Sequence, residues 1–268
     1  MTMPANRPDH LPDPAHARSI STQSIEFVAI LAVKSLADAK SRLTGWDDDH
    51  RRNLVIAMLA DTIAAIHAAG CARVLVISPD PVVLAEAAAC GASGLLEPTG
   101  PGRPGTPADG LNQAMADAMA AARRRRPGVR RLVLVQADLP AATGDQIRAA
   151  LTAASSHRQA FVADRRGTGT ALLVRDADLT TQTRFGADSA ALHRLDGLAE
   201  LDPGHSLWAG LRNDVDTIED LTAAIGLGVG ERTAQAVGSR SAGARITRTT
   251  QSSPTAGRRD HRCVMIDG

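Results

Sequence analysis

The amino-acid sequence predicts a three-layer α/β fold built on a mixed, mainly parallel sheet. Short apolar runs of strand length alternate along the chain with longer stretches in which apolar residues recur at helical spacing, a pattern typical of parallel sheets covered by helices. Two runs, Glu26–Val33 (EFVAILAV) and Arg131–Gln136 (RLVLVQ), are almost continuously apolar, as expected of strands buried on both faces. Charged residues follow both runs, and sheets of this kind bind ligands at the carboxyl ends of their strands.

The other strands are predicted from shorter aliphatic runs, several of which are bounded by glycine. Beyond the two runs above, we expect strands at Arg73–Ser78, Gly94–Glu97, Ala160–Ala163, Thr170–Val174 and Leu211–Val215.

The helices are predicted from apolar residues three or four positions apart, together with capping signals at the ends. The first begins near Asp49 and ends at Gly70. Thr143 followed by Gln146 is a capping-box signature for another helix. Further helices are expected over Pro81–Cys90, after a Gly/Pro-rich loop at residues 99–109, from Asp188 or Ser189 to Leu195, and from near Thr217.

The composition indicates a globular domain with an aliphatic core. Hydrophobic residues make up 44% of the 268 residues, but the chain has only three Phe, two Trp and no Tyr. The net charge is +1, and without its two ends the chain has a slight excess of acidic residues. This balance gives no electrostatic reason to expect nucleic-acid binding. No apolar stretch is long enough to span a membrane.

Both ends of the chain differ in composition from its centre. Residues 1–24, rich in Pro, His and Asp, are expected to form a flexible N-terminal arm and not a signal peptide. Residues 25–237 carry the strand and helix patterns and form the predicted domain. Residues 238–268 are rich in Arg, Ser, Thr and Gly without apolar periodicity, so we expect a disordered tail. Three cysteines without CxxC spacing favour a reducing, cytoplasmic location.

A cationic loop follows the first predicted strand. It reads AVKSLADAKSRL and contains Lys34, Lys40 and Arg42 within nine residues. The chain has 28 Arg but only two Lys, and both lysines lie in this loop. Such a loop is suited to a triphosphate, since Arg42 offers a bidentate guanidinium. The alternative is a solvated loop with ordinary surface charges.

Aspartates lie in or shortly after two other predicted strands. Asp138 comes directly after the strand Arg131–Gln136, in the motif QADLP, where a carboxylate is well placed to hold Mg²⁺. Asp214 and Asp216 alternate along an expected extended segment, which places them on one face about 7 Å apart. The three carboxylates together are a candidate metal site. Asp138 is otherwise a turn residue before proline, and Asp216 is otherwise a cap for the helix near Thr217.

A fourth candidate region contains glycines and hydroxyl side chains. It comprises the segment 164–170 (DRRGTGT) and the segment 184–189 (RFGADS). Glycines allow close approach of the backbone to an anion, and the helix that begins at Asp188 or Ser189 offers free N–H groups to a phosphate or carboxylate. The structural alternative is a hairpin turn and an ordinary helix cap.

Several familiar site types are not supported. Residues 100–105 match GxGxxG, but they follow no long strand, open no helix and contain two prolines, so a dinucleotide site is not predicted. The sequence contains no GxxxxGK[ST], no HExxH and no GxSxG motif, which leaves P-loop, zinc-protease and serine-hydrolase chemistry unsupported.

Taken together, these motifs resemble one family over about residues 26–237. The chain is similar to the guanylyltransferases of coenzyme F-420 biosynthesis, called FbiD in actinobacteria and CofC in methanogens. The resemblance implies a Rossmann-like, glycosyltransferase-A-like nucleotidyltransferase fold. It also implies transfer of GMP from GTP to phosphoenolpyruvate or, in archaea, to 2-phospho-L-lactate; a few members use 3-phosphoglycerate. The motifs that carry it are AVKSLADAKSRL, GLNQA, QADLP, FVADRRGTGTALL, RFGADSAALH and LRNDVDTIEDL.

The resemblance also implies roles for individual residues. Asp138 is the first metal carboxylate and a catalytic residue, and Asp214 or Asp216 is the second. Mg²⁺ is the implied cofactor. The acceptor contacts match Thr170, Gly186 and Ser189. The nucleotide contacts match Lys34, Lys40, Arg42 and Asn112, of which Lys34 and Arg42 also act in catalysis.

The bias towards Arg over Lys and the Ala-rich helices suggest a high-GC bacterium, for which the family resemblance implies phosphoenolpyruvate as the acceptor. A downstream transferase of coenzyme F-420 biosynthesis is the expected recipient of the product. Two other classes stay open from the sequence: a sugar-transferring enzyme of the same fold and a non-catalytic nucleotide-binding module.

Overall fold

The structure, a computed structural model, describes residues 27–37, 40, 42–43, 45–98 and 107–239. The expected arm, most of the Gly/Pro-rich loop and nearly all of the expected tail lie outside these residues. Helices and strands alternate along the described chain. The strands are β1 (Phe27–Ala32), β2 (Arg73–Ser78), β3 (Ser93–Leu96), β4 (Arg131–Val135), β5 (Gln159–Ala163), β6 (Thr170–Asp176) and β7 (Ala199–Glu200). The helices are α1 (Asp48–Ala68), α2 (Pro81–Ala89), α3 (Pro107–Arg125), α4 (Gly144–Ala153), α5 (Ser189–Leu195) and α6 (Ile218–Leu227).

The seven strands form a single mixed sheet of order β3-β2-β1-β4-β6-β5-β7. β1 pairs in parallel with β2 and β4, and β2 with β3. β6 is antiparallel to both of its neighbours, β4 and β5. This confirms the predicted three-layer, mainly parallel α/β fold. Because β6 runs in the reverse direction, its first residue, Thr170, lies at the sheet edge where β1 and β4 end.

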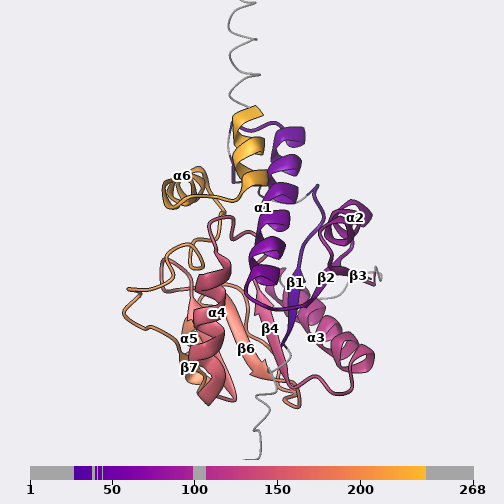
Figure 1. Ribbon diagram of the computed structural model, residues 1–268, viewed down its shortest axis with the longest axis vertical. Coiled ribbons are helices and arrows are strands. Elements are labelled where there is room, and N and C mark those ends of the chain that lie inside the picture. Colours follow the sequence, from indigo (N-terminus) through magenta and orange to yellow (C-terminus); the bar gives the residue numbers. More distant parts are fainter. Residues whose placement is uncertain (1–26, 38–39, 41, 44, 99–106, 240–268) are drawn as a thin grey trace, which may run out of the picture.

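Helices cover both faces of the sheet, as Figure 1 shows. On one face α1 packs beside α2 and α4 over a core that includes Leu31, Ile63 and Ile66. On the other face α3 packs over β1 and β2, with Met115 and Met119 in a second core. The core is aliphatic, as the composition predicts, and each fully buried Leu or Ile contributes about 1.5–3 kcal/mol to folding.

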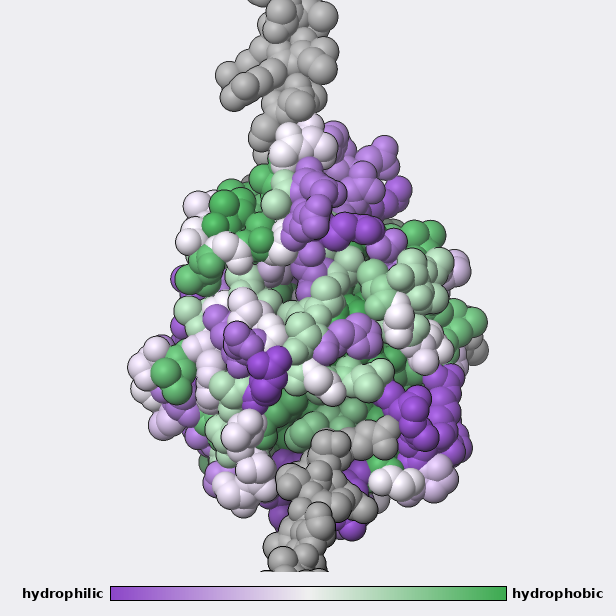
Figure 2. Space-filling model, in the orientation of Figure 1, coloured by the Kyte–Doolittle hydropathy of each residue, from purple (hydrophilic) through white to green (hydrophobic). Residues whose placement is uncertain are grey.

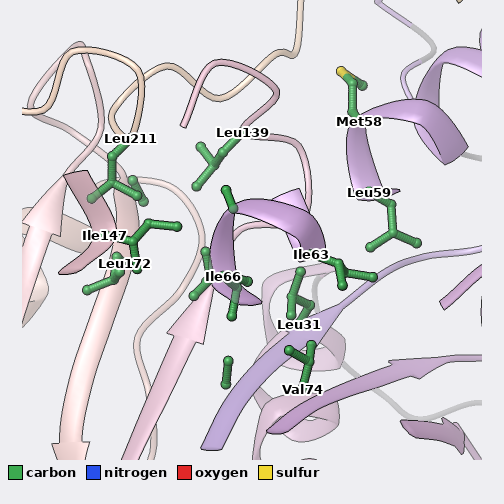
Figure 3. Packing of buried hydrophobic residues seen from close by; sticks show 14 of the residues in the cluster. Leu31, Met58, Leu59, Ile63, Ile66, Val74, Leu139, Ile147, Leu172 and Leu211 are labelled. Atoms are coloured by element: carbon green, nitrogen blue, oxygen red, sulfur yellow. The ribbon is translucent and has the colours of Figure 1, made fainter. Parts of the chain in front are cut away.

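Figure 3 shows how this packing links the first half of the chain to the second. Leu59, Ile63 and Ile66 of α1 lie over Leu31 and Val74. Leu139 and Leu211 belong to the same cluster, on the side where Ile147 of α4 lies. Leu139 immediately follows Asp138 and is fully buried. The packing therefore fixes the backbone beside Asp138 at the end of β4.

The predicted strand at Leu211–Val215 is wrong. The segment forms a turn and an irregular stretch, and the sheet instead gains β7 at Ala199–Glu200. Side chains hold the segment in place of a strand ladder: the buried Arg212 guanidinium donates to the carbonyl of Ala163 at 2.7 Å and pairs with Asp202 at 3.0 Å. Hydrogen bonds from one side chain to several backbone carbonyls leave no periodic pattern in the sequence. The alternation of residues along this segment therefore does not predict its structure.

The described chain continues as a helix past the expected end of the domain. Residues 231–239 are helical, and the boundary expected after Val237 falls inside this helix. The Asp61 carboxylate of α1 accepts the backbone N–H groups of Arg232 and Thr233 at 3.2 and 2.8 Å. Thr233 is fully buried, so this helix is part of the folded domain.

No described helix is long and apolar enough to cross a membrane. On the face shown in Figure 2, strongly hydrophilic residues occur in several separate groups with apolar and weakly polar residues between them. This face does not present one continuous charged field.

Candidate active site

A cavity of about 410 Å³ lies at the carboxyl ends of β1 and β4. It forms there because both strands end at the same edge and their following loops carry polar residues. The backbone supports this edge: Val33 donates to the carbonyl of Ile77 at 2.9 Å, and Gln136 donates to the carbonyl of Ala171 at 3.0 Å. Six charged side chains line the cavity: Lys34, Lys40, Arg42, Asp138, Asp214 and Asp216.

The structure therefore brings the predicted triphosphate loop and the predicted metal carboxylates to one place. Lys34 and Arg42 are exposed, and Lys40 is mostly buried. The segment after residue 212 reaches the end of β4 through a backbone hydrogen bond from Val215 to the carbonyl of Asp138, at 3.1 Å. Asp214 and Asp216 are the two neighbours of Val215 in the chain. The bond from Val215 therefore holds both aspartates close to Asp138.

Lys40 bridges two of the carboxylates. Its Nζ donates to Asp138 Oδ2 and, at 2.7 Å, to Asp216 Oδ1. Burial by itself lowers the pKa of the Lys40 ammonium, but the charges of Asp138 and Asp216 outweigh it and hold this pKa above its usual value. Lys40 is therefore a fixed cation between the loop after β1 and the carboxylates.

Asp214 lies in the same cavity but, unlike Asp138 and Asp216, forms no salt bridge with Lys40. Burial raises the pKa of the Asp214 carboxyl to about 7, and the carboxylates of Asp138, Asp216 and Asp164 add to the shift. Three carboxylates thus line the same cavity as the mostly buried Lys40 ammonium. Such a concentration of negative charge favours binding of a further cation.

The residues fit a hard divalent cation by their chemistry. Mg²⁺ prefers carboxylate oxygens, and Asp138 Oδ1 is a buried oxygen with no hydrogen-bond partner. Within the described part of the chain, however, no three Asp, Glu, His or Cys side chains are already gathered around a common point. The Lys40 ammonium lies between Asp138 and Asp216 and bonds to both.

Asp216 does not cap the following helix. Thr217 is the N-cap of α6, and it forms a capping box with Asp220. The Asp216 side chain points instead to Lys40. The structure thus removes the alternative that Asp216 serves only as a helix cap.

The predicted acceptor residues lie at the neighbouring part of the same edge. Thr170 begins β6 and Ser189 begins α5, and their hydroxyl oxygens are 3.0 Å apart. Both side chains are buried, at 3% and 1% exposure. The first N–H groups of α5 already have partners, because Ser189 donates to the carbonyl of Gly186 and Ala190 to that of Thr168. The expected free N–H groups at this helix start are therefore largely occupied.

His193 completes this cluster and was missed in the sequence. Its Nδ1 lies 3.0 Å from Thr170 Oγ1, and its Nε2 lies 3.3 Å from the backbone N–H of Arg184. A backbone N–H only donates, so Nε2 accepts and the neutral ring carries its proton on Nδ1, which donates to Thr170. The spacing of Ser189 and His193, four residues apart on one helix, was the available signal.

The His193 ring is enclosed by aromatic side chains. The Phe161 ring lies 5.4 Å away between centroids, and the Phe185 ring contacts it edge-on at 5.8 Å. Burial lowers the pKa of His193 to about 4, an effect that Arg184 and Arg175 reinforce and Asp196 opposes. His193 is therefore neutral at physiological pH.

Asn112 and Gly186 line a second cavity of about 360 Å³, separate from the one that contains Lys34, Lys40 and Arg42. The Asn112 amide donates to the carbonyl of Phe185 at 2.8 Å and accepts from the N–H of Phe185 at 2.8 Å. The amide thus anchors the backbone just before Gly186. The expected nucleotide contact of Asn112 stays a prediction.

The fold resembles that of solved nucleotide-handling transferases. A putative nucleotide-diphospho-sugar transferase from Desulfovibrio desulfuricans G20 superposes with a TM-score of 0.56 at 19% identity, over 82% of this chain and 97% of that one. A nucleotidyl transferase from Methanothermobacter gives a TM-score of 0.51 at 14% identity, over 75% and 97%. At these identities the likeness defines the fold.

Relatives of higher identity define the class and the family. The phosphoenolpyruvate guanylyltransferase of Mycobacterium sp. (strain KMS) is 46% identical over 210 residues, 78% of this chain and 90% of that protein. That of Rhodococcus opacus (strain B4) is 43% identical over 230 residues, 82% and 94%. The protein is thus a nucleotidyltransferase. A family model described as "Guanylyl transferase CofC like" matches residues 27–239, and the chain belongs to this family.

Proposed function

We propose that this protein transfers GMP from GTP to phosphoenolpyruvate and releases pyrophosphate. The observation that carries the proposal is the cavity at the ends of β1 and β4, in which three cationic and three anionic side chains meet. Transfer between phosphates depends mainly on positioning and charge stabilisation, so it needs such groups more than a covalent nucleophile. The relatives named above carry this activity in their names.

The cations of the cavity are suited to the triphosphate. Lys34 and Arg42 are exposed to the cavity and reach it from a single loop. In the proposed reaction an oxygen of the acceptor phosphate attacks the α-phosphorus in line. Lys34, Lys40 and Arg42 then neutralise the charge that develops on the departing pyrophosphate.

The carboxylates are suited to a magnesium ion. Asp138, with Asp214 or Asp216, would hold Mg²⁺, which supplies Lewis-acid stabilisation of the reacting phosphate oxygens when it is bound. The unpartnered Asp138 Oδ1 supports this role. The backbone carbonyl of Asp138 also accepts the N–H of Val215. Asp138 therefore links the end of β4 to the segment that carries Asp214 and Asp216.

The acceptor is proposed to bind near Gly186, Thr170 and Ser189. Gly186 has φ = 130°, a conformation that side chains other than that of glycine rarely adopt, and it lines the second cavity with an exposed backbone. The buried Ser189 donates its backbone N–H to the carbonyl of Gly186 and its hydroxyl to Thr170. Phosphoenolpyruvate and 2-phospho-L-lactate carry the same two anions, so discrimination by shape is worth only about 1–3 kcal/mol.

The test is a product assay with GTP and Mg²⁺. Phosphoenolpyruvate, 2-phospho-L-lactate and 3-phosphoglycerate are supplied at equal concentration, and the GMP adducts are resolved by mass. We expect pyrophosphate release and a dominant phosphoenolpyruvate adduct, which a later transferase of coenzyme F-420 biosynthesis would consume. A dominant 3-phosphoglycerate adduct would contradict the acceptor assignment. Failure to release pyrophosphate with any phosphoacid would leave the sugar transferase or the non-catalytic binding module.

A further inference from the structure

Lys40 occupies an unusual position for a nucleotide-binding lysine. Its backbone has φ = 55°, in the left-handed region that residues other than glycine seldom adopt. Its side chain is only 13% exposed, and its ammonium is bonded to Asp138 and Asp216. Lys34, the other lysine of the chain, lines the same cavity but is exposed, and no salt bridge joins it to a described residue.

The contacts of Lys40 compete directly with metal binding. The Lys40 ammonium lies between the two carboxylates, 2.7 Å from Asp216 Oδ1 and bonded to Asp138 Oδ2, with Asp138 Oδ1 left unpartnered. A divalent ion held by both side chains would need oxygens that the ammonium now occupies. A magnesium ion binds carboxylate oxygens at about 2.0–2.1 Å. A singly charged ammonium and a divalent ion cannot both hold these oxygens, because their charges repel at such short separation.

An incoming triphosphate offers Lys40 a second set of partners. The phosphates enter a cavity that Lys40 already lines, and they carry more negative charge than the carboxylate pair. If Lys40 moves to the phosphates as the metal takes the carboxylates, every charge stays paired during the exchange. Pairing matters here because leaving one member of a buried ion pair without its partner is strongly unfavourable.

We propose that Lys40 is an internal counter-ion for the metal carboxylates, which weakens metal binding until the triphosphate draws Lys40 away. The metal and GTP then enter the site together. This inference rests on the proposed function, since it assigns the cavity to a metal and a nucleoside triphosphate. It adds a regulatory step at that site: the carboxylates are protected from binding a divalent ion without its nucleotide.

The experiment measures the binding of Mn²⁺ alone to the full chain by calorimetry or electron paramagnetic resonance. Lys40→Met removes the ammonium and keeps a flexible apolar side chain of similar length. Lys34→Met removes the same charge from the same cavity and is the matched control. We expect Lys40→Met to bind Mn²⁺ at least about tenfold more tightly than the unmodified protein, which corresponds to about 1.4 kcal/mol. Lys34→Met should stay within about twofold.

Each other outcome overturns the inference. Equal or weaker Mn²⁺ binding by Lys40→Met, or no detectable binding, would show that the ammonium does not compete with the metal. Equal tightening by Lys34→Met would show only the loss of one positive charge. Lys40→Gln and circular dichroism check that any change does not come from a misfolded variant.

This result is independent of the transfer assay. Mn²⁺ binding requires neither GTP nor an acceptor, whereas the proposed function is tested by pyrophosphate release from the unmodified protein. If Lys40→Met binds Mn²⁺ tightly but the unmodified protein transfers no GMP, the proposed function is wrong and the counter-ion role of Lys40 still holds. If the unmodified protein transfers GMP but Lys40→Met binds Mn²⁺ no more tightly, the function holds and the counter-ion role is wrong.

Discussion

Two clusters at the same edge of the sheet are built from different interactions. The cluster around Lys40, Asp138 and Asp216 is charged and lines an open cavity. The cluster of Thr170, Ser189 and His193 is uncharged, buried and joined by hydrogen bonds of 3.0 Å. Ion pairs beside a cavity can exchange partners with charged ligands, whereas a buried neutral network holds one geometry. We therefore expect the first cluster to carry the chemistry and the second to fix the shape of this edge of the sheet.

The largest expected effect follows from removing one charge in the first cluster. Asp138→Asn keeps the size of the side chain but removes the charge that holds Lys40 and a metal ion. We expect pyrophosphate release to fall about a thousandfold, while the variant stays folded because Asp216 still pairs with the Lys40 ammonium. Turnover and urea unfolding measure the two effects. A folded variant with nearly normal turnover would remove Asp138 from the mechanism.

A change in the second cluster should affect one substrate only. His193→Phe fills the same space but removes the donor to Thr170 Oγ1 and the acceptor for the Arg184 N–H. We expect the KM for the acceptor to rise about tenfold, because a misplaced hydrogen bond to a charged group costs about 1.5–3 kcal/mol. The KM for GTP should stay the same.

The matched variant is His193→Asn, whose amide nitrogen can take the place of Nδ1 and donate to Thr170. It should recover part of the acceptor KM. Equal increases in both KM values for His193→Phe would point to a general distortion of the edge and erase the distinction between the two clusters.

The same histidine predicts a pH dependence of stability. Burial lowers the pKa of His193 to about 4 from an ordinary value of 6.5. Between these values the unfolded chain binds the proton and the folded chain does not, so the stabilisation is complete above about pH 6.5 and is lost as the pH falls towards 4. Between pH 7 and pH 5 the unmodified protein should lose about 2 kcal/mol more than His193→Asn. Urea unfolding at both pH values measures the difference, and parallel losses would contradict it.

The smallest effect is expected at the C-terminus, which belongs to neither cluster. The sequence predicts a disordered tail that begins at residue 238. The helix at residues 231–239 now places the cut after Ser239, beyond the segment anchored to Asp61. We expect this truncation to change pyrophosphate release by less than about twofold and to leave the unfolding midpoint unchanged. A large loss of activity would give residues 240–268 a role in the site.

The sequence by itself determined the fold class and most of the elements of the sheet. Buried strands such as β1 require continuous apolar residues, and this requirement is visible without any partner strand. The N-cap of α4 was also predictable from the sequence. As expected, the Thr143 hydroxyl accepts the N–H of Gln146. These features depend on residues close together in the chain.

The sequence likewise placed the cationic loop and Asp138 at one edge, because parallel strands end on the same side of a sheet. The comparisons confirm the family that these motifs indicated. The roles of the individual residues stay proposals, and the experiments above address them.

Only the tertiary structure decided how distant residues pair. The reversal of β6 brings Thr170 to the functional edge, and the Arg212 guanidinium holds an irregular segment where a strand was expected. The bond between Lys40 and Asp138 joins residues 98 positions apart, and the bond between His193 and Thr170 joins two elements. Such contacts depend on which side chains meet after the sheet and helices pack, and that encounter has no periodic signal in the sequence.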